Sequence, residues 1–236
     1  MKPGQVFLQA KLAVPRLLDQ LDGLQAGRSH HRAQAPDLSF DEVTCVSCPA
    51  GGAQSLDVGK CLVGADVDPL VRRGRPVLEQ LASELGEAAN LAIARRFDLV
   101  YVDQVDPPHV MAPNWYGRAV PLHATSTGKA YLAYLPDDEQ EAVLPRRLER
   151  YTETTVTDRR TLGEQLAAVR RDGYAICVGE LEESLFGASA PVLSEQGRPV
   201  AIVSVWGTEH RLPRERLPEV GRRVVEAAEE LKELLR

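Results

Sequence analysis

The apolar and polar positions from Asp68 onward follow the periods of regular helices and strands. Asp68 followed by Pro69 is typical of a helix start, because Asp can accept hydrogen bonds from free N–H groups and Pro lacks the N–H that would stay unpaired. Pro76 interrupts the run and predicts a kink or two abutting helices, and Gly86 predicts its end. The apolar residues at near-helical spacing are Leu70, Val77, Leu78, Leu81 and Leu85.

Short apolar runs and helix caps alternate through the rest of the chain. Six strands are predicted, over residues 90–94, 99–105, 109–112, 174–178, 187–193 and 199–205, with the first two forming a hairpin. Four further helices are predicted. The first is capped by Thr125 or Ser126 and ends near Leu135, and a short one begins at Asp137. The third is capped by Thr157 or Asp158 and closed by Gly173. The last has one apolar face, made of Leu217, Val220, Val224, Ala227, Leu231 and Leu234. This order favours an α+β fold with a mainly antiparallel sheet.

The chain changes character near residue 66. Residues 23–65 are rich in Gly, Ser, Ala and Cys and show little periodicity. We therefore expect two parts, residues 1–65 and residues 66–236. The composition is that of a globular protein, without a signal peptide or an apolar run long enough to span a membrane, so we expect a cytoplasmic protein.

Charge is unevenly distributed along the 236 residues. The formal net charge is -6, which argues against the whole chain acting as an electrostatic nucleic-acid binder. Residues 1–35 nevertheless hold five Lys or Arg against two Asp, a mild basic surplus compatible with a segment that faces DNA.

Three segments carry a resemblance to a known family. Residues 120–130 read Val-Pro-Leu-His-Ala-Thr-Ser-Thr-Gly-Lys-Ala; residues 171–175 read Arg-Asp-Gly-Tyr-Ala and are followed by Gly-Ala-Ser-Ala-Pro-Val at 187–192; residues 197–207 read Gly-Arg-Pro-Val-Ala-Ile-Val-Ser-Val-Trp-Gly. In this order and spacing they resemble the effector-binding domain of IclR-type transcriptional regulators. The resemblance covers about residues 66–236.

The resemblance implies a GAF-like domain whose curved sheet encloses a cavity for a small organic effector. It implies operator DNA and the effector as partners, homodimers or homotetramers, and no cofactor. The cavity positions that it implies are Trp115, Ser126, Thr127, Cys177, Leu185, Gly187, Ser204 and Trp206. Two large indoles would narrow the cavity and favour a flat or apolar ligand. We expect the effector to be a carboxylic or aromatic acid. The alternative for both Trp residues is that they fill core space, and for Cys177 that it is a buried structural thiol.

The same family carries an N-terminal winged helix-turn-helix. Residues 11–21 are similar to its recognition helix, with Lys11 and Arg16 as the DNA-binding candidates. The preceding helices need about 30 residues and only ten are present, so we expect a truncated or divergent DNA-binding region.

Other constellations point to different chemistry. Cys45 and Cys48, with Cys61 and the His30-His31 pair, suggest a zinc site but lack a complete four-ligand pattern. Residues 125–129 do not have the spacing of a phosphate-binding loop, although the N–H groups at this helix start could bind an anion. His123 near Ser126 suggests nucleophilic catalysis, but no nucleophile elbow surrounds Ser126. We expect His123 to brace the turn by hydrogen bonding, and we expect no enzymatic activity.

Two functions follow from these features. The first is a ligand-responsive transcriptional regulator, in which an effector in the C-terminal domain changes the arrangement of DNA-binding heads. The second is a stand-alone ligand-binding or interaction module that has lost DNA binding, which the short, irregular N-terminal segment favours.

Overall fold

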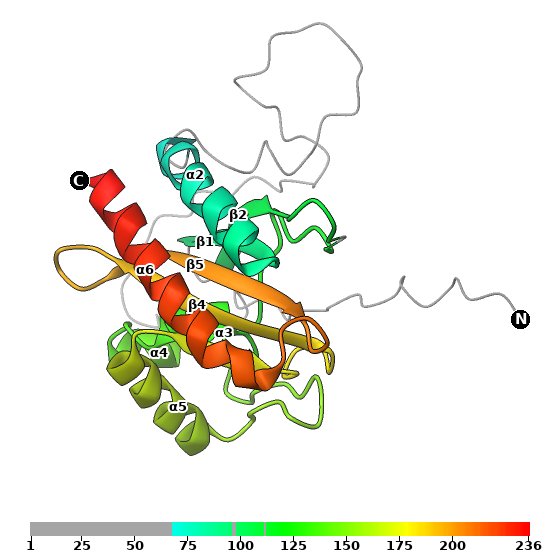
Figure 1. The fold of residues 1–236 in the computed structure, drawn as a ribbon. Helices are drawn as coiled ribbons and strands as arrows, with labels where there is room; N and C mark the ends of the chain where they lie inside the picture. The colour runs from blue at the N-terminus through cyan, green and yellow to red at the C-terminus, as the bar shows by residue number, and fades with distance from the viewer. Residues whose placement is uncertain (1–67, 96–97, 111) are drawn as a thin grey trace, which may run out of the picture. The chain divides into compact units, whose positions relative to one another are not determined.

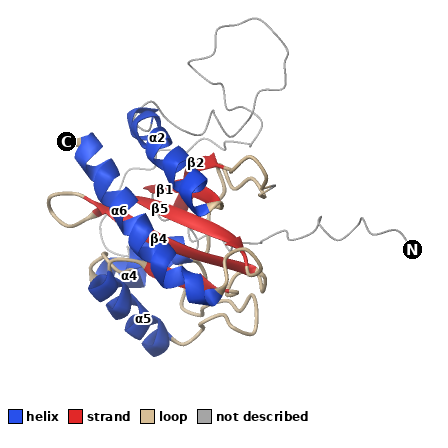
Figure 2. Ribbon diagram, viewed as in Figure 1, coloured by secondary structure: helices blue, strands red, loops and turns tan. Residues whose placement is uncertain are grey.

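The computed structural model describes residues 68–95, 98–110 and 112–236, which form an antiparallel sheet with helices on both faces (Figures 1 and 2). The strand order is β2-β1-β5-β4-β3, and each neighbouring pair is antiparallel. The elements are α2 (Asp68–Leu85), β1 (Ala88–Arg95), β2 (Asp98–Val105), α3 (Ser126–Leu132), α4 (Asp137–Val143), α5 (Arg159–Asp172), β3 (Ala175–Val178), β4 (Leu185–Leu193), β5 (Pro199–Thr208), η2 (Arg214–Arg216) and α6 (Leu217–Leu235). The predicted α+β class is confirmed.

The central strands are buried on both faces, and the pleat divides their side chains between two cores. Along β5, Ala201, Val203 and Val205 pack with residues of α2 and α6. The alternate residue Ile202 packs with residues of α3 and α5 on the opposite face. Because successive side chains of a strand point to opposite faces, Ser204 and Trp206 share the face of Ile202. This face carries the site described below.

Capping residues set the starts of α3 and α5 and the end of α5. The Thr125 side chain accepts from the Gly128 N–H at the start of α3, and the Asp158 carboxylate accepts from the Thr161 N–H at the start of α5. Gly173 ends α5 in the left-handed conformation, with φ of 82°, which a glycine adopts without strain. These caps confirm the predicted helix starts.

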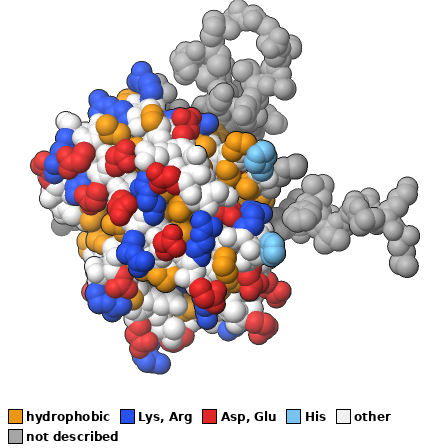
Figure 3. Space-filling view, viewed as in Figure 1, with side chains coloured by type: hydrophobic (Ala, Val, Ile, Leu, Met, Phe, Trp, Pro, Cys, Tyr) orange, Lys and Arg blue, Asp and Glu red, His pale blue; other side chains and the backbone are white. Residues whose placement is uncertain are grey.

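Helices α2 and α6 lie side by side over one face of the sheet (Figure 1). The guanidinium of Arg223 donates to the Glu84 carboxylate across them at 2.6 Å. The outer surface of this layer mixes acidic and basic side chains, with apolar ones between them (Figure 3). Leu234, which we placed on the buried stripe of the last helix, is 45% exposed. Its neighbour Leu235, four residues after the buried Leu231, packs against the core in its place.

Three further predictions differ from the structure. Of the two outcomes predicted at Pro76, the division into two helices does not occur, because apolar residues before and after it pack against one core; a kink stays a prediction. His109, Val110 and Ala112 form no strand; His109 lies in a turn in which the Val110 N–H donates to the Pro107 carbonyl. Helix α3 ends at Leu132 instead of near Leu135.

Among the helices of the described ranges, none has the length and apolar character that crossing a membrane requires. The predicted N-terminal helical segment lies outside the described residues.

Candidate effector site

The register of the sheet brings distant cavity residues together on one face. Cys177 is opposite Gly187 on β4, and Gly187 is opposite Trp206 on β5. In the next row on the same face, Ser189 is opposite Ser204. Residues from three strands, spread over thirty positions of the chain, therefore form two adjacent rows.

Helix α3 closes over these rows through a chain of buried hydroxyl groups. Ser126 Oγ accepts from Ser189 Oγ at 2.8 Å, and Ser189 Oγ lies 3.2 Å from Thr127 Oγ1. Thr127 Oγ1 in turn lies 2.8 Å from the Tyr101 hydroxyl on β2. Burial raises the pKa of Tyr101, so its hydroxyl stays protonated at neutral pH. These bonds hold the first turn of α3 against the sheet and satisfy groups that burial would otherwise leave unpaired.

Gly187 permits this close approach. A Cβ at this position would lie 2.9 Å from the Val205 carbonyl oxygen, 3.2 Å from Trp206 Cβ and 3.3 Å from Ser126 Oγ. A larger residue at position 187 would therefore push β4 away from β5 and from α3.

The rows and the helix enclose a small cavity. Its volume, taken as the space open to the centre of a water molecule, is about 40 Å³, enough for a few waters. Among the described residues, no charged side chain lines this cavity. All eight positions that the resemblance implies line it. The complete lining is Tyr101, Trp115, Val120, Ala124, Thr125, Ser126, Thr127, Cys177, Leu181, Leu185, Phe186, Gly187, Ser204 and Trp206. That these residues bind an effector stays a prediction.

Three aromatic rings form one wall. The Trp115 ring lies 6.4 Å from Tyr101 and 6.3 Å from Trp206 between centroids, both edge-to-face. The Nε1 atoms of both Trp residues are buried and have no hydrogen-bond partner in the part of the chain that the structure describes. Trp N–H groups usually find a partner when buried, so each of these donors lacks the acceptor that it would normally have. Trp115 lies in a loop and not in the strand segment where we expected it.

His123 and Ser126 do not form a catalytic pair. A carbonyl oxygen only accepts, so His123 Nε2 carries a proton and donates to the Glu149 carbonyl at 2.8 Å. Ser126 Oγ accepts from Ser189. Burial lowers the pKa of His123 and keeps the ring neutral. His123 therefore joins the turn before α3 to the loop that contains Glu149, which is the bracing role that we predicted.

Cys177 is a buried thiol that donates to the Ala124 carbonyl at 3.2 Å. Burial raises its pKa from 9.0 to about 11, so the thiol is protonated and a poor nucleophile at neutral pH. It both lines the cavity and ties β3 to the loop before α3, so its two sequence interpretations, cavity residue and structural thiol, are compatible.

The raised pKa of Cys177 makes a pH dependence of stability testable. The unfolded thiol ionises first, so the unfolded chain binds fewer protons as pH rises and stability is lost between pH of about 9 and about 11. We expect the unfolding free energy of the native chain, relative to Cys177→Ser, to fall by about 2–3 kcal/mol over this window. Denaturant titrations at stepped pH measure it. A constant difference between the two chains would contradict the buried thiol.

Several lining residues were not foreseen. Tyr101, Leu181 and Phe186 line the cavity, as do Val120, Ala124 and Thr125. The alternation of residues 99–105 places Leu99 and Tyr101 on one face, but only the packing of α3 shows that this face carries the cavity.

Lys11, Arg16, Cys45, Cys48 and Cys61 lie outside the described residues, so their DNA-binding and metal roles are not addressed by the structure. Within the described ranges, no group of three or more His, Cys, Asp and Glu could hold a metal ion.

Comparison with known proteins defines the class. The family model described as bacterial transcriptional regulator IclR C-terminal matches residues 65–233. This match and the fold together define the C-terminal domain of a bacterial transcriptional regulator. The chain belongs to the IclR family. The prediction of a regulator and not an enzyme agrees with this assignment. The division of the chain near residue 66 stays a prediction.

Individual relatives support the assignment. The chain is 34% identical to the transcriptional repressor IclR of Escherichia coli over 162 residues, which are 66% of this chain and 58% of the repressor. It thus spans less than two thirds of that relative. IclR of Thermotoga maritima has a similar structure, with TM-score 0.64 and 29% identity over 70% of this chain and 67% of that chain. The inducer-binding domain of a PobR double mutant from Acinetobacter, in complex with 3-hydroxybenzoic acid, has TM-score 0.62 and 27% identity over 68% of this chain and 96% of that chain.

Proposed function

We propose that the protein is a ligand-responsive transcriptional regulator that binds a small organic effector in the cavity beneath α3 and operator DNA through its N-terminal region. The observation that carries the proposal is the convergence of all eight family-implied positions on one cavity. Sheet register and the start of α3 bring these positions together from far apart in the sequence. An effector that prefers one arrangement of the DNA-binding regions would shift the population toward it.

The cavity favours a flat ligand with hydrogen-bond acceptors. Its walls combine aromatic and aliphatic side chains with hydroxyl groups. Among the described residues, the lining donors without a partner are the indole N–H groups of Trp115 and Trp206 and the hydroxyl of Ser204. An aromatic acid offers a ring for the edge-to-face wall and oxygens for these donors. Because no cation lines the cavity, only neutral donors would hold a carboxylate, and an amide of the same shape should bind comparably. A related inducer-binding domain takes 3-hydroxybenzoic acid.

The cavity is narrower than a benzene ring requires. At about 40 Å³ it admits such a ligand only if lining side chains move, and we propose that Trp115 or Trp206 is the side chain that does. Such a movement would couple binding to a change in the loop that carries Trp115. This coupling is the physical requirement of a switch, because the ligand then has different affinities for two conformations.

Tryptophan fluorescence tests ligand binding directly. The two Trp residues of the chain both line this cavity, so a bound ligand should alter their emission. We expect a saturable change, with a rise in melting temperature, for at least one of benzoate, 3-hydroxybenzoate and benzamide. Trp206→Phe and Trp115→Phe each keep an aromatic ring and lose one donor, and each should weaken binding about tenfold, the effect of one hydrogen bond. No response to any of these compounds would contradict an aromatic effector.

DNA binding is tested separately. Binding of the full chain to promoter fragments at low salt, weakened by Lys11→Ala and Arg16→Ala, would support the regulator. Retained ligand binding without DNA binding would support the stand-alone module. We further propose that the chain acts as a homodimer or homotetramer, which sedimentation with and without ligand would test.

A further inference from the structure

A second and larger cavity lies along the free edge of β3, which is the outermost strand of the sheet. It is a groove of about 450 Å³ on the same measure, roughly ten times the first, and the two share no lining residue. Ile176 and Val178 of β3 line it, whereas Cys177 between them lines the first cavity, so the groove uses the opposite face of the strand. The remaining lining is Lys129, Thr154, Val156, Gln165, Ala168, Val169, Asp172, Tyr174, Glu180, Arg214, Leu217 and Pro218.

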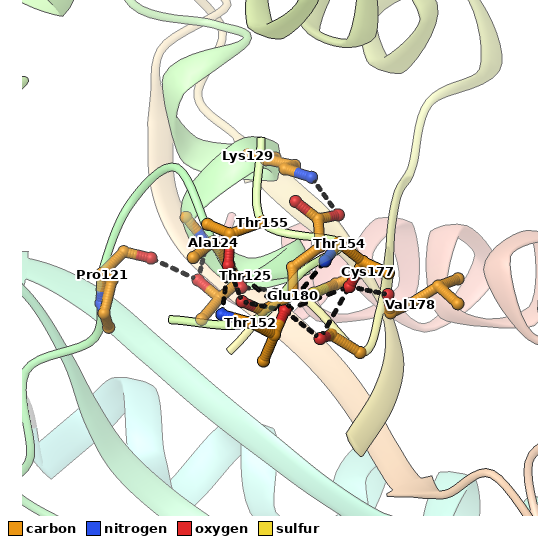
Figure 4. Close-up of polar contacts among 12 residues, drawn as sticks. Pro121, Ala124, Thr125, Lys129, Thr152, Thr154, Thr155, Cys177, Val178 and Glu180 are labelled. Atoms are coloured by element: carbon orange, nitrogen blue, oxygen red, sulfur yellow. Dashed lines mark hydrogen bonds and ion pairs between the residues drawn. The ribbon is translucent and has the colours of Figure 1, made fainter. Parts of the chain in front are cut away.

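The groove contains a buried ion pair with unused hydrogen-bonding capacity. Lys129 Nζ donates to Glu180 Oε1, and the two side chains are 1% and 7% exposed (Figure 4). The other carboxylate oxygen, Glu180 Oε2, is buried and has no hydrogen-bond partner within the described ranges, and the same holds for Gln165 Oε1. Among the described residues, Glu180 is the one partner of the Lys129 ammonium, which has three N–H donors. Glu180 Oε2 can therefore accept a further hydrogen bond, and Lys129 Nζ can donate others.

Three threonine hydroxyl groups bind the backbone carbonyls of Gly179 and Glu180. The hydroxyls of Thr152 and Thr154 donate to the Gly179 carbonyl at 2.7 and 2.8 Å, and Thr155 donates to the Glu180 carbonyl at 2.7 Å (Figure 4). Gly179 has φ of 65°, and a Cβ there would lie 2.8 Å from the Glu183 carbonyl oxygen. These contacts fix the backbone that carries Glu180, and Lys129 holds one of its two carboxylate oxygens.

We propose that this groove is a second ligand site, which takes a neutral alcohol with a compact apolar body. A hydroxyl group both donates and accepts, so it can bond to Glu180 Oε2 and accept from Lys129 Nζ. The apolar body would pack on Tyr174, Ile176 and Val178. A charged group is unsuited to the position beside the ion pair, because Lys129 and Glu180 already neutralise each other and a further charge buried next to them would be uncompensated. The proposal does not rest on the effector function of the first cavity.

The test uses three probes of one shape on the full chain. Cyclohexanol has the hydroxyl, methoxycyclohexane cannot donate, and cyclohexylammonium is charged. We expect cyclohexanol to shift the methyl NMR signals of Ile176 and Val178 saturably. The ether and the ammonium should bind about tenfold more weakly, the effect of one hydrogen bond. Tryptophan emission should not change, because both indoles lie in the other cavity.

Neighbouring alanines on α5 provide a matched pair of variants. Ala168 lines the groove, whereas Ala167 is exposed and does not line it. Ala168→Phe should abolish the cyclohexanol response, and Ala167→Phe should leave it unchanged. Equal binding of alcohol and ether, a response that survives Ala168→Phe, or no saturable response, as a groove filled by water would give, overturns the proposal. If Ala168→Phe does not fold, the comparison of alcohol and ether on the native chain still decides.

Discussion

Replacing Gly128 by alanine should destabilise the C-terminal domain by about 3 kcal/mol or more, at the upper end of the cost of overpacking. Gly128 lies in the first turn of α3, where a Cβ would be 2.6 Å from the carbonyl carbon of Leu122 and also too close to its Cα and oxygen. The obstacle is backbone, which cannot rotate away as a side chain could. Denaturant unfolding followed by the fluorescence of Trp115 and Trp206 measures the loss.

Gly163 is a matched control for this substitution. It lies within α5, and a Cβ there would meet nothing within 4 Å. Gly163→Ala should stabilise the domain by about 0.5–1 kcal/mol, because alanine has the higher helix propensity. The two Gly→Ala changes therefore have opposite signs. A stabilising Gly128→Ala would mean that α3 does not rest against the backbone at Leu122, and the cavity geometry would be wrong with it.

Removing one member of the Lys129–Glu180 pair should cost about 3–5 kcal/mol. In Lys129→Met the Glu180 carboxylate stays buried without its counter-ion, and in Glu180→Met the ammonium does. The double variant removes both charges, so we expect it to be more stable than either single variant. Unfolding free energies of the four chains form a double-mutant cycle that measures the coupling.

An exposed pair gives the comparison. Arg160 and Glu164 lie one turn apart on α5 with side chains 80% and 63% exposed. Arg160→Ala should leave the melting temperature nearly unchanged, because solvent screens such pairs. If Lys129→Met were equally mild, the pair would be hydrated and not buried, and the second cavity would lose its unpaired carboxylate oxygen.

The sequence predicted most elements because their signals are local. Asp158 and Gly173 bound α5, and both act within a few residues of their own backbone. The strand over residues 109–112 was wrong because an apolar run does not show whether a neighbouring strand is free to pair with it. Leu234 was placed inside because spacings of three and four residues both fit a helix face, and the sequence does not show that Leu235 and not Leu234 packs against the core.

For the candidate site, the sequence by itself determined which residues to examine: the ordered motifs named the family, and all eight implied positions line one cavity. Only the tertiary structure decided how small that cavity is and which donors in it are unpaired, because volume and hydrogen-bond satisfaction depend on groups brought together from separate strands. The same holds for the larger groove at the edge of β3. Lys129 and Glu180 are 51 residues apart, and no local pattern predicts that they meet as a buried pair with one oxygen free.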